Sequence, residues 1–112
     1  FTTAEALSAG DLVYINASGE VLKADANDVA KAAVGFVLSS ASGGASTTVY
    51  FEGSITGLSG LTRGSKYFLS ASAAGAVSTT VPSGAGDIVQ YIGVATSTTE
   101  MTFEPQTPMV RV

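Results

Sequence analysis

The stretch GDLVYINAS at residues 10–18 is matched further along the chain by GSKYFLSAS at residues 64–72. In both, a glycine precedes a short, mainly apolar run that ends at small residues typical of turns. A further glycine and a valine follow each stretch, at Gly19 and Val21 and at Gly75 and Val77. Short apolar runs bounded in this way predict strands joined by tight turns. We therefore expect one β-hairpin over residues 11–24 and a second over residues 66–80.

The similarity continues beyond the two hairpins. Residues 34–37 (VGFV) match residues 92–95 (IGVA), and Phe51-Glu52 matches Phe103-Glu104. The order of these segments is the same in both halves while the loop lengths differ, which indicates a duplicated unit. Chance similarity between two glycine-punctuated β stretches is the alternative explanation. We predict an all-β fold, a small β-barrel or β-sandwich built from two similar hairpin-containing halves that share one hydrophobic core.

Four further segments complete the expected secondary structure. Residues 47–52 (TTVYFE) are expected to pair with the apolar run at 34–38, and residues 88–95 and 99–104 flank a turn of threonine and serine. Residues 27–33 are the one segment with a helical pattern, and their length predicts one short helical turn. Asp25 or Asn27 is expected to cap it, because a short side-chain oxygen accepts a hydrogen bond from a free backbone N–H.

A chain of 112 residues suits one domain. We predict a single β domain over residues 1–105, with its halves at about 10–53 and 64–105, and a C-terminal tail over 106–112. The tail has two interpretations: a frayed end, or a strand added to a neighbouring subunit. The residues predicted to bind a partner lie at the two ends of the chain: Phe1, Pro108, Met109, Val110, Arg111 and Val112.

The composition argues against chemistry and against nucleic acid as a partner. Charged residues make up only 12% of the chain, the net charge is −4, and His and Cys are absent. Nucleic-acid binding depends on clustered cations, which the five scattered Lys and Arg residues do not supply. No apolar run approaches the roughly 20 residues of a membrane helix. We predict no catalytic residue, no metal and no cofactor, so the chain is not expected to be an enzyme. A hydrolase acting through Glu52 or Glu104 is the catalytic alternative.

Two aromatic pairs fall within the expected strands. Side chains of successive strand residues point to opposite faces of a sheet. Of Tyr50-Phe51 and of Tyr67-Phe68, one ring each is therefore expected in the core and the other on the surface.

The segment GLSGLTRGSKYFLS at residues 57–70 resembles a phrase that recurs in structural proteins of tailed bacteriophages. That phrase usually reads GLTPG-x-x-YYLS, and Arg63 stands where proline is usual. The matches continue through residues 74–82, 89–95 and 98–105. In the front half, residues 9–14 (AGDLVY) and 35–38 (GFVL) are similar to the opening of small phage capsid cement proteins.

The resemblance implies a bacteriophage virion structural protein without catalytic residues. The first function that it implies is that of a capsid decoration (cement) protein, which stabilises the phage head at the capsid surface. The implied partners are the major capsid protein and further copies of the chain, arranged as a homotrimer. The alternative is a domain of a head or tail fibre that binds a glycan or protein of the host surface. That function would use outward aromatic rings and the Ser/Thr-rich loop at residues 39–48.

Overall fold

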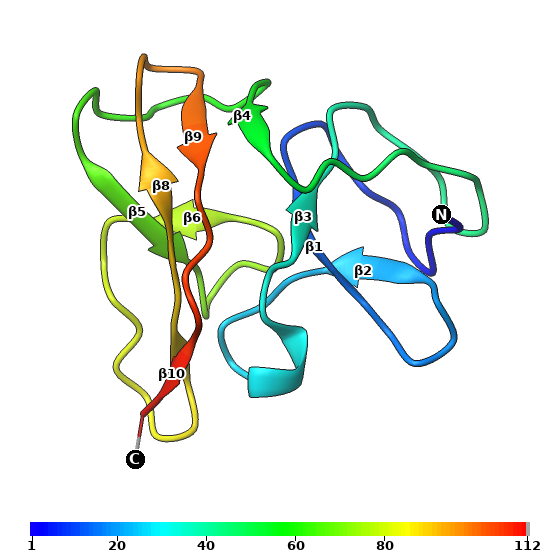
Figure 1. Cartoon of the computed structure of the whole chain (residues 1–112), viewed down its shortest axis with the longest axis horizontal. Coiled ribbons are helices and arrows are strands. Elements are labelled where there is room, and N and C mark those ends of the chain that lie inside the picture. Colours follow the sequence, from blue (N-terminus) through cyan, green and yellow to red (C-terminus); the bar gives the residue numbers. More distant parts are fainter. Residues whose placement is uncertain (112) are drawn as a thin grey trace.

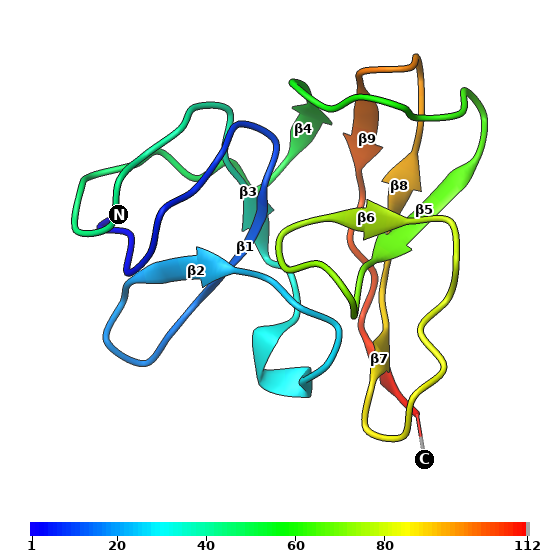
Figure 2. The ribbon, with the colours of Figure 1, turned by 180° about the vertical axis from the view of Figure 1, so that it is seen from behind.

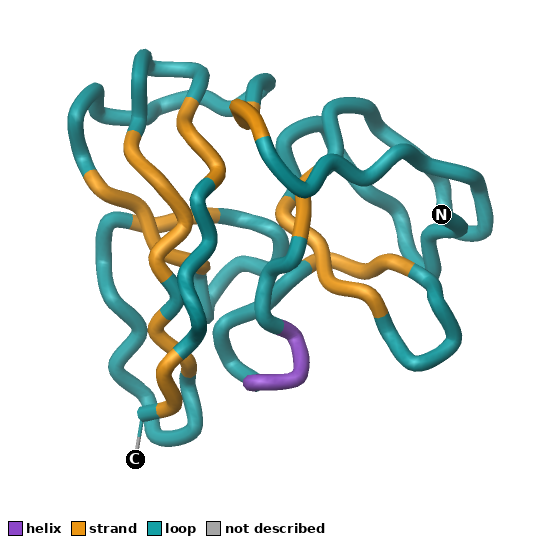
Figure 3. Tube along the Cα trace, viewed as in Figure 1, coloured by secondary structure: helices purple, strands orange, loops and turns teal. Residues whose placement is uncertain are grey.

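A computed structural model describes residues 1–111 and shows an all-β chain with a single short helical turn (Figure 1). Figure 3 shows that the strands are short segments separated by long loops. The predicted fold class, with two similar halves that each contain a hairpin, is confirmed. The elements are β1 (Leu12–Ile15), β2 (Val21–Lys23), the 3-10 turn η1 (Val29–Lys31), β3 (Gly35–Phe36), β4 (Gly53–Ile55), β5 (Lys66–Leu69), β6 (Val77–Ser78), β7 (Ile88–Val89), β8 (Tyr91–Val94), β9 (Met101–Phe103) and β10 (Met109–Val110).

The sequence repeat corresponds to a repeat of strand order and register. One three-stranded antiparallel sheet has the order β2-β1-β3, and a second has the equivalent order β6-β5-β8. In the first sheet Val13 lies opposite Gly35. In the second, Tyr67 lies opposite Gly93, and these are the positions that the sequence match aligns with Val13 and Gly35. The two sheets are therefore built to the same plan.

Equivalent backbone hydrogen bonds begin each half. The N–H of Gly10 donates to the carbonyl of Val37, and the N–H of Gly64 donates to the carbonyl of Ala95, both at 2.8 Å. Gly10 and Gly64 have φ angles of 90° and 85°, a region that glycine adopts without strain. Each glycine thus turns the chain into the first strand of its half, β1 or β5. Its hydrogen bond fixes that strand to the segment directly after β3 or β8.

The interior corrects the expectation of one shared core. A large cluster contains residues of both halves, and the Phe36 and Phe103 rings meet within it edge to face with centroids 5.0 Å apart. The N-terminal half also has a separate cluster of its own, formed by Leu7, Val13, Val21, Val37 and Val49. Their sequence equivalents in the other half all belong to or pack against the large cluster: Leu61, Tyr67, Val77, Ala95 and Met101. Each half therefore has a small core of equivalent residues, and in the C-terminal half that core merges with the contact between the halves.

A buried amide ties the two halves together. Gln90 is 2% exposed, and its side chain pairs with the backbone of Ala33, 57 residues away. The Oε1 atom accepts from the Ala33 N–H and the Nε2 atom donates to the Ala33 carbonyl, both at 2.9 Å. The side chain thus makes the two hydrogen bonds with Ala33, just after η1, that the backbone of a neighbouring strand would otherwise make. It satisfies two backbone groups that would otherwise lack partners in the interior.

Several local expectations are corrected. The hairpins β1–β2 and β5–β6 form as predicted. In contrast, β9 pairs with β4, and although it packs against β8, its β-ladder with residues 88–95 is reduced to one bridge, between Ala95 and Met101. The helical turn is capped by Asp28, which lies directly before η1, so the assignment of the cap to Asp25 or Asn27 was wrong.

Part of the tail pairs with its own domain. Residues 109 and 110 form β10, which pairs with β7 of the same chain. The Arg111 N–H also donates to the Asp87 carbonyl at 2.7 Å. Val112 lies outside the described residues.

Two equivalent glycines permit a close approach of two backbone segments. A Cβ atom at Gly93 would lie 2.1 Å from the carbonyl oxygen of Thr102, and one at Gly35 would lie 2.8 Å from that of Tyr50. Neither distance is compatible with a real Cβ atom, and a backbone carbonyl cannot rotate away as a flexible side chain would. Only glycine therefore allows the later segment of each half to lie so close to β3 or β8.

Substitution of Gly93 by alanine is expected to lower the free energy of unfolding by about 3 kcal/mol, at the upper end of ordinary overpacking. Gly43→Ala is the matched control, because its added Cβ would lie no closer than 3.6 Å to another atom. The control is expected to change the stability by no more than about 0.5 kcal/mol. Urea denaturation followed by circular dichroism measures both. Equal midpoints for the two variants would show that the close approach of the backbone does not require glycine at position 93.

Gln90→Met keeps the length of the side chain but removes both of its hydrogen-bonding groups. Leaving the Ala33 N–H and carbonyl without partners is expected to cost about 2–4 kcal/mol, since each unsatisfied group costs roughly 1–3 kcal/mol. Gln106→Met, at an exposed position, is the control and is expected to be nearly neutral. Wild-type stability of the Gln90 variant, measured in the same denaturation experiment, would show that this amide does not hold the halves together.

Candidate functional site

The residues predicted to bind a partner lie at two separate places. Figure 1 and Figure 2 show the two ends of the chain on opposite sides of the domain. Phe1 belongs to the N-terminal side, whereas Pro108, Met109, Val110 and Arg111 belong to the C-terminal side. The structure therefore does not bring the predicted residues together, and each side is a candidate contact surface by itself.

The N-terminal surface consists of two aromatic rings, Phe1 and Phe51, which we call the aromatic pair. Both rings are about half exposed, at 50% and 52%, and they meet edge to face with centroids 6.1 Å apart. The backbone of Phe1 is held in place by Thr47, whose N–H donates to the Phe1 carbonyl at 2.7 Å. The pair is thus a fixed apolar feature on the surface.

The exposure of Phe51 was not predicted. The alternation rule placed one ring of Tyr50-Phe51 in the core, but both are exposed. Phe51 and the residue after it lie in a bend between a single β-bridge and β4, so no continuous strand imposes alternation there. The rule holds for Tyr67-Phe68, which lie within β5: Tyr67 is buried and Phe68 is only partly so.

The C-terminal surface is the edge strand β10. Met109 is 71% exposed and is the most exposed large apolar side chain of the described residues, and Val110 beside it is also exposed. Within residues 1–111, β10 pairs with β7 alone, so its second edge carries backbone groups without a strand partner. An exposed edge of this kind is a template for a further strand.

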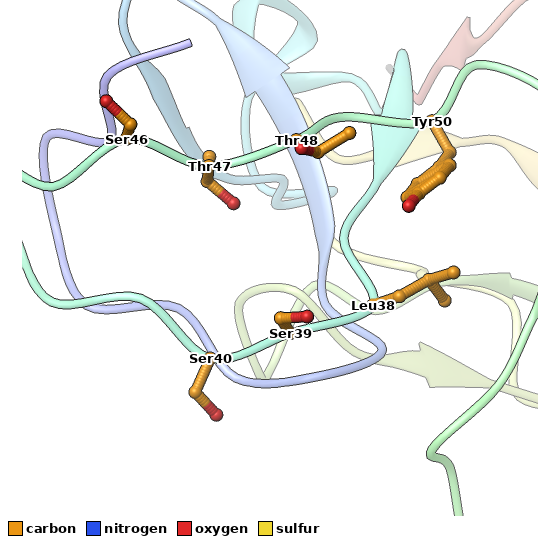
Figure 4. Close-up of a pocket in the computed structure, with 7 residues that line it drawn as sticks. All are labelled: Leu38, Ser39, Ser40, Ser46, Thr47, Thr48 and Tyr50. Carbon is orange, nitrogen blue, oxygen red and sulfur yellow. The ribbon is translucent and has the colours of Figure 1, made fainter.

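A third feature is an open slot between two segments of the N-terminal half (Figure 4). Its volume is about 290 Å³, close to the lower limit for ligand pockets. None of the described lining residues is charged, and six of them bear hydroxyl groups. The lining residues are Leu38, Ser39, Ser40, Ser46, Thr47, Thr48 and Tyr50. The sequence had singled out the loop at 39–48 for the fibre alternative, but not the slot itself.

The slot begins where a β-ladder stops. Phe36 and Tyr50 exchange both of their backbone hydrogen bonds at 2.9 Å. A regular antiparallel ladder would next pair Leu38 with Thr48 and then Ser40 with Ser46. Within the described residues, the backbone groups of these four residues make no backbone hydrogen bonds. The expected hairpin of 34–38 with 47–52 is therefore reduced to one bridge, beyond which the two segments separate.

The acidic residues do not assemble into a centre. Glu52 and Glu104, considered for the hydrolase alternative, are both exposed. Among the described residues no group of three acidic side chains is placed to hold a metal ion. Within residues 1–111, no helix is long and apolar enough to cross a bilayer.

Partial burial perturbs the environment of the Asp11 carboxyl. Its Oδ2 atom accepts from the Ser8 N–H at 2.9 Å. Partial burial raises the pKa of Asp11, and this effect outweighs the hydrogen bond from Ser8 and the charge of Lys23, which lower it. Because Asp11 lies between Gly10 and β1, a structural role at the start of the first strand accounts for its position.

No family model fits the chain, and no curated protein is significantly similar to it. Support for a function therefore comes from the residues of this chain and from the resemblance of its sequence phrases.

Asp11→Asn tests the electrostatic environment. A raised pKa in the folded state means that ionisation of Asp11 lowers stability as the pH rises through the folded pKa, and asparagine does not ionise. The stability of the variant relative to the wild type is therefore expected to increase with pH above about 3.9, the ordinary pKa of an aspartate. Denaturation midpoints between pH 2.5 and 7 measure this difference. A difference that stays constant or falls with pH would contradict the assignment.

Proposed function

We propose that the chain is a bacteriophage virion structural protein, a decoration (cement) protein that stabilises the phage head at the capsid surface. The proposal starts from the sequence phrases at residues 57–70 and 9–14, which resemble such proteins. The proposed partners are the major capsid protein and further copies of the chain in a homotrimer. No catalytic step is part of the proposal.

The observation that carries the proposal is the presence of two exposed apolar surfaces on opposite sides of a thin domain. The domain measures 33 × 33 × 20 Å. The aromatic pair lies on one side and β10 on the other, as the two ends of the chain show in Figure 1. Exposed apolar groups that cluster in this way mark interaction sites. One such surface attaches a domain to a partner, whereas two on opposite sides allow it to join two partners, which is the task of a cement protein.

The energetics suit repeated weak contacts. A phenylalanine side chain buries roughly 150–250 Å², so covering the exposed half of one ring contributes roughly 2.5 kcal/mol at about 25 cal/mol per Å². Association costs offset much of this gain for a single contact. A domain that contacts two neighbours at once gains further, because the second contact forms at a high effective concentration.

The first experiment locates the chain. Mass spectrometry of purified phage particles is expected to detect it, and cryo-electron microscopy is expected to place it on the outer face of the head. Its absence from particles, or a position in the tail, would contradict the proposal.

Phe51→Ser and Met109→Ser then test the two surfaces. Each is expected to weaken rebinding to capsids stripped of the chain by about tenfold or more, as for a central apolar contact. Val81→Ser is the control, because Val81 is exposed but belongs to neither surface. Co-sedimentation measures binding, and circular dichroism confirms that each variant is folded. Wild-type rebinding of both surface variants would remove the support that the structure gives to the proposal.

A further inference from the structure

The slot between residues 38–40 and 46–48 is bordered on both sides by backbone groups that have no hydrogen-bonded strand partner among the described residues. Phe36 and Tyr50 form the last hydrogen-bonded pair, and the next two pairs of the ladder are not made. Leu38 and Ser39 lie in a bend, so strand alternation does not by itself orient the first wall. The outward bonds do: Val37 and Ala41 on one wall, and Ala45 and Thr47 on the other, bond away from the slot. The N–H and carbonyl groups between them, of Leu38 and Ser40 and of Ser46 and Thr48, have no backbone partner among the described residues and are available to the slot.

The other half of the chain shows what a completed ladder looks like. The sequence match aligns Leu38 with Thr96 and Thr48 with Glu100. The Thr96 N–H donates to the Glu100 carbonyl at 3.0 Å, and the bridge between Ala95 and Met101 lies next to it. A tight turn closes that ladder. In the N-terminal half the same ladder is open, and a longer loop connects its two walls.

Each wall of the slot is held from its outer side. On one wall, Val37 bonds to Gly10 and Asp11 while Ala41 exchanges both backbone bonds with Leu7. On the other, the N–H of Thr47 and the carbonyl of Ala45 bond to the backbone of residues 1–3. These bonds fix the two walls independently of one another. The slot is thus preorganised, which lowers the entropic cost of filling it.

We propose that this slot accepts an extended, uncharged peptide segment of another protein, which inserts as a strand and completes the open ladder on both sides. Addition of a strand to an exposed edge is a known mode of peptide recognition. The walls run antiparallel, so the inserted strand lies parallel to one wall and antiparallel to the other. The proposal does not depend on the virion assignment.

The lining defines the chemistry of the segment. No charged side chain faces the slot, so nothing there compensates the desolvation of a charged residue. Serine and threonine occupy five of the seven lining positions, and they provide hydroxyl groups rather than deep apolar pockets. Small neutral residues in an extended backbone therefore match the slot. Its main-chain groups provide the affinity, and the shape limits the side chains.

Binding is tested with the whole chain and a capped pentapeptide of alternating threonine and alanine. Saturating peptide is expected to slow hydrogen exchange of the slot-facing amides of Leu38, Ser40, Ser46 and Thr48 by about tenfold or more, measured by NMR. The control is the same peptide with alternate amides methylated, because it cannot donate along one edge. Equal effects of both peptides, or no protection with either, would overturn the proposal.

Neutral oligosaccharides are the competing occupant, since hydroxyl groups and the Tyr50 ring also suit a sugar. Maltotriose in the same NMR experiment is expected to leave these four amides unchanged. Protection by maltotriose without protection by the peptide would replace the proposed strand with a glycan. Protection that appears only as the concentration of the chain itself is raised would indicate a second copy as occupant and would also overturn the proposal.

A closed slot provides an independent test. The chain contains no cysteine, so Leu38→Cys with Thr48→Cys introduces a single possible disulfide. If the ladder closed at this position, the two Cα atoms would come to about 5.5 Å, the spacing of a hydrogen-bonded antiparallel pair, which is within the range of a disulfide. The oxidised variant is expected to lose peptide binding and the reduced variant to retain it. Equal binding in both states would place the peptide elsewhere. If the disulfide does not form, the wild-type exchange experiment decides.

Discussion

The close approach of the backbone at Gly35 and Gly93 is the constraint on which the rest of the structure depends. In each half β3 or β8 pairs with the first strand of the hairpin, and a later segment lies close against it. A side chain at either glycine would push that segment away by more than the packing allows. This close approach also fixes the residue that follows Gly35. Phe36 is thereby placed against Phe103, and this ring contact lies where the two halves meet.

The two halves share this plan but differ in how their backbone N–H and carbonyl groups are hydrogen-bonded. In the C-terminal half, a tight turn closes the ladder between Thr96 and Glu100, and β9 continues outward to pair with β4. β4 follows closely after Tyr50, the residue that lies against Gly35 in the N-terminal half. The pairing of β4 with β9 therefore joins the halves by their backbones. The N-terminal half keeps its own five-residue core but leaves its ladder open beyond Tyr50. One copy of the unit thus completes the fold, and the other has an incomplete edge.

Local patterns in the sequence predicted what local interactions determine. The hairpins of β1–β2 and β5–β6 follow from apolar runs and turn residues that lie close together, and aligning the halves predicted their shared order. The pairing of β4 with β9 was missed because it joins distant segments whose match depends on the packing of the whole domain. The exposure of Phe51 was missed because alternation was assumed where the chain bends. The slot was missed because its signal is the absence of hydrogen bonds, which no residue type encodes.

The composition limits the ways in which this domain can recognise anything. With 12% charged residues, the surface has little electrostatic attraction with which to select a partner, and half of the chain consists of Gly, Ala, Ser and Thr, whose side chains are too small to build deep pockets. Two means of recognition are left: burial of the few large apolar groups that remain outside the core, and hydrogen bonding by the main chain where a ladder is incomplete. The aromatic pair and β10 provide the first, and the slot provides the second. The first depends on the identity of a few surface side chains, whereas the second depends on shape and backbone geometry. The buried glycines that set the course of the chain therefore act on recognition indirectly, by determining where the ladder is left open.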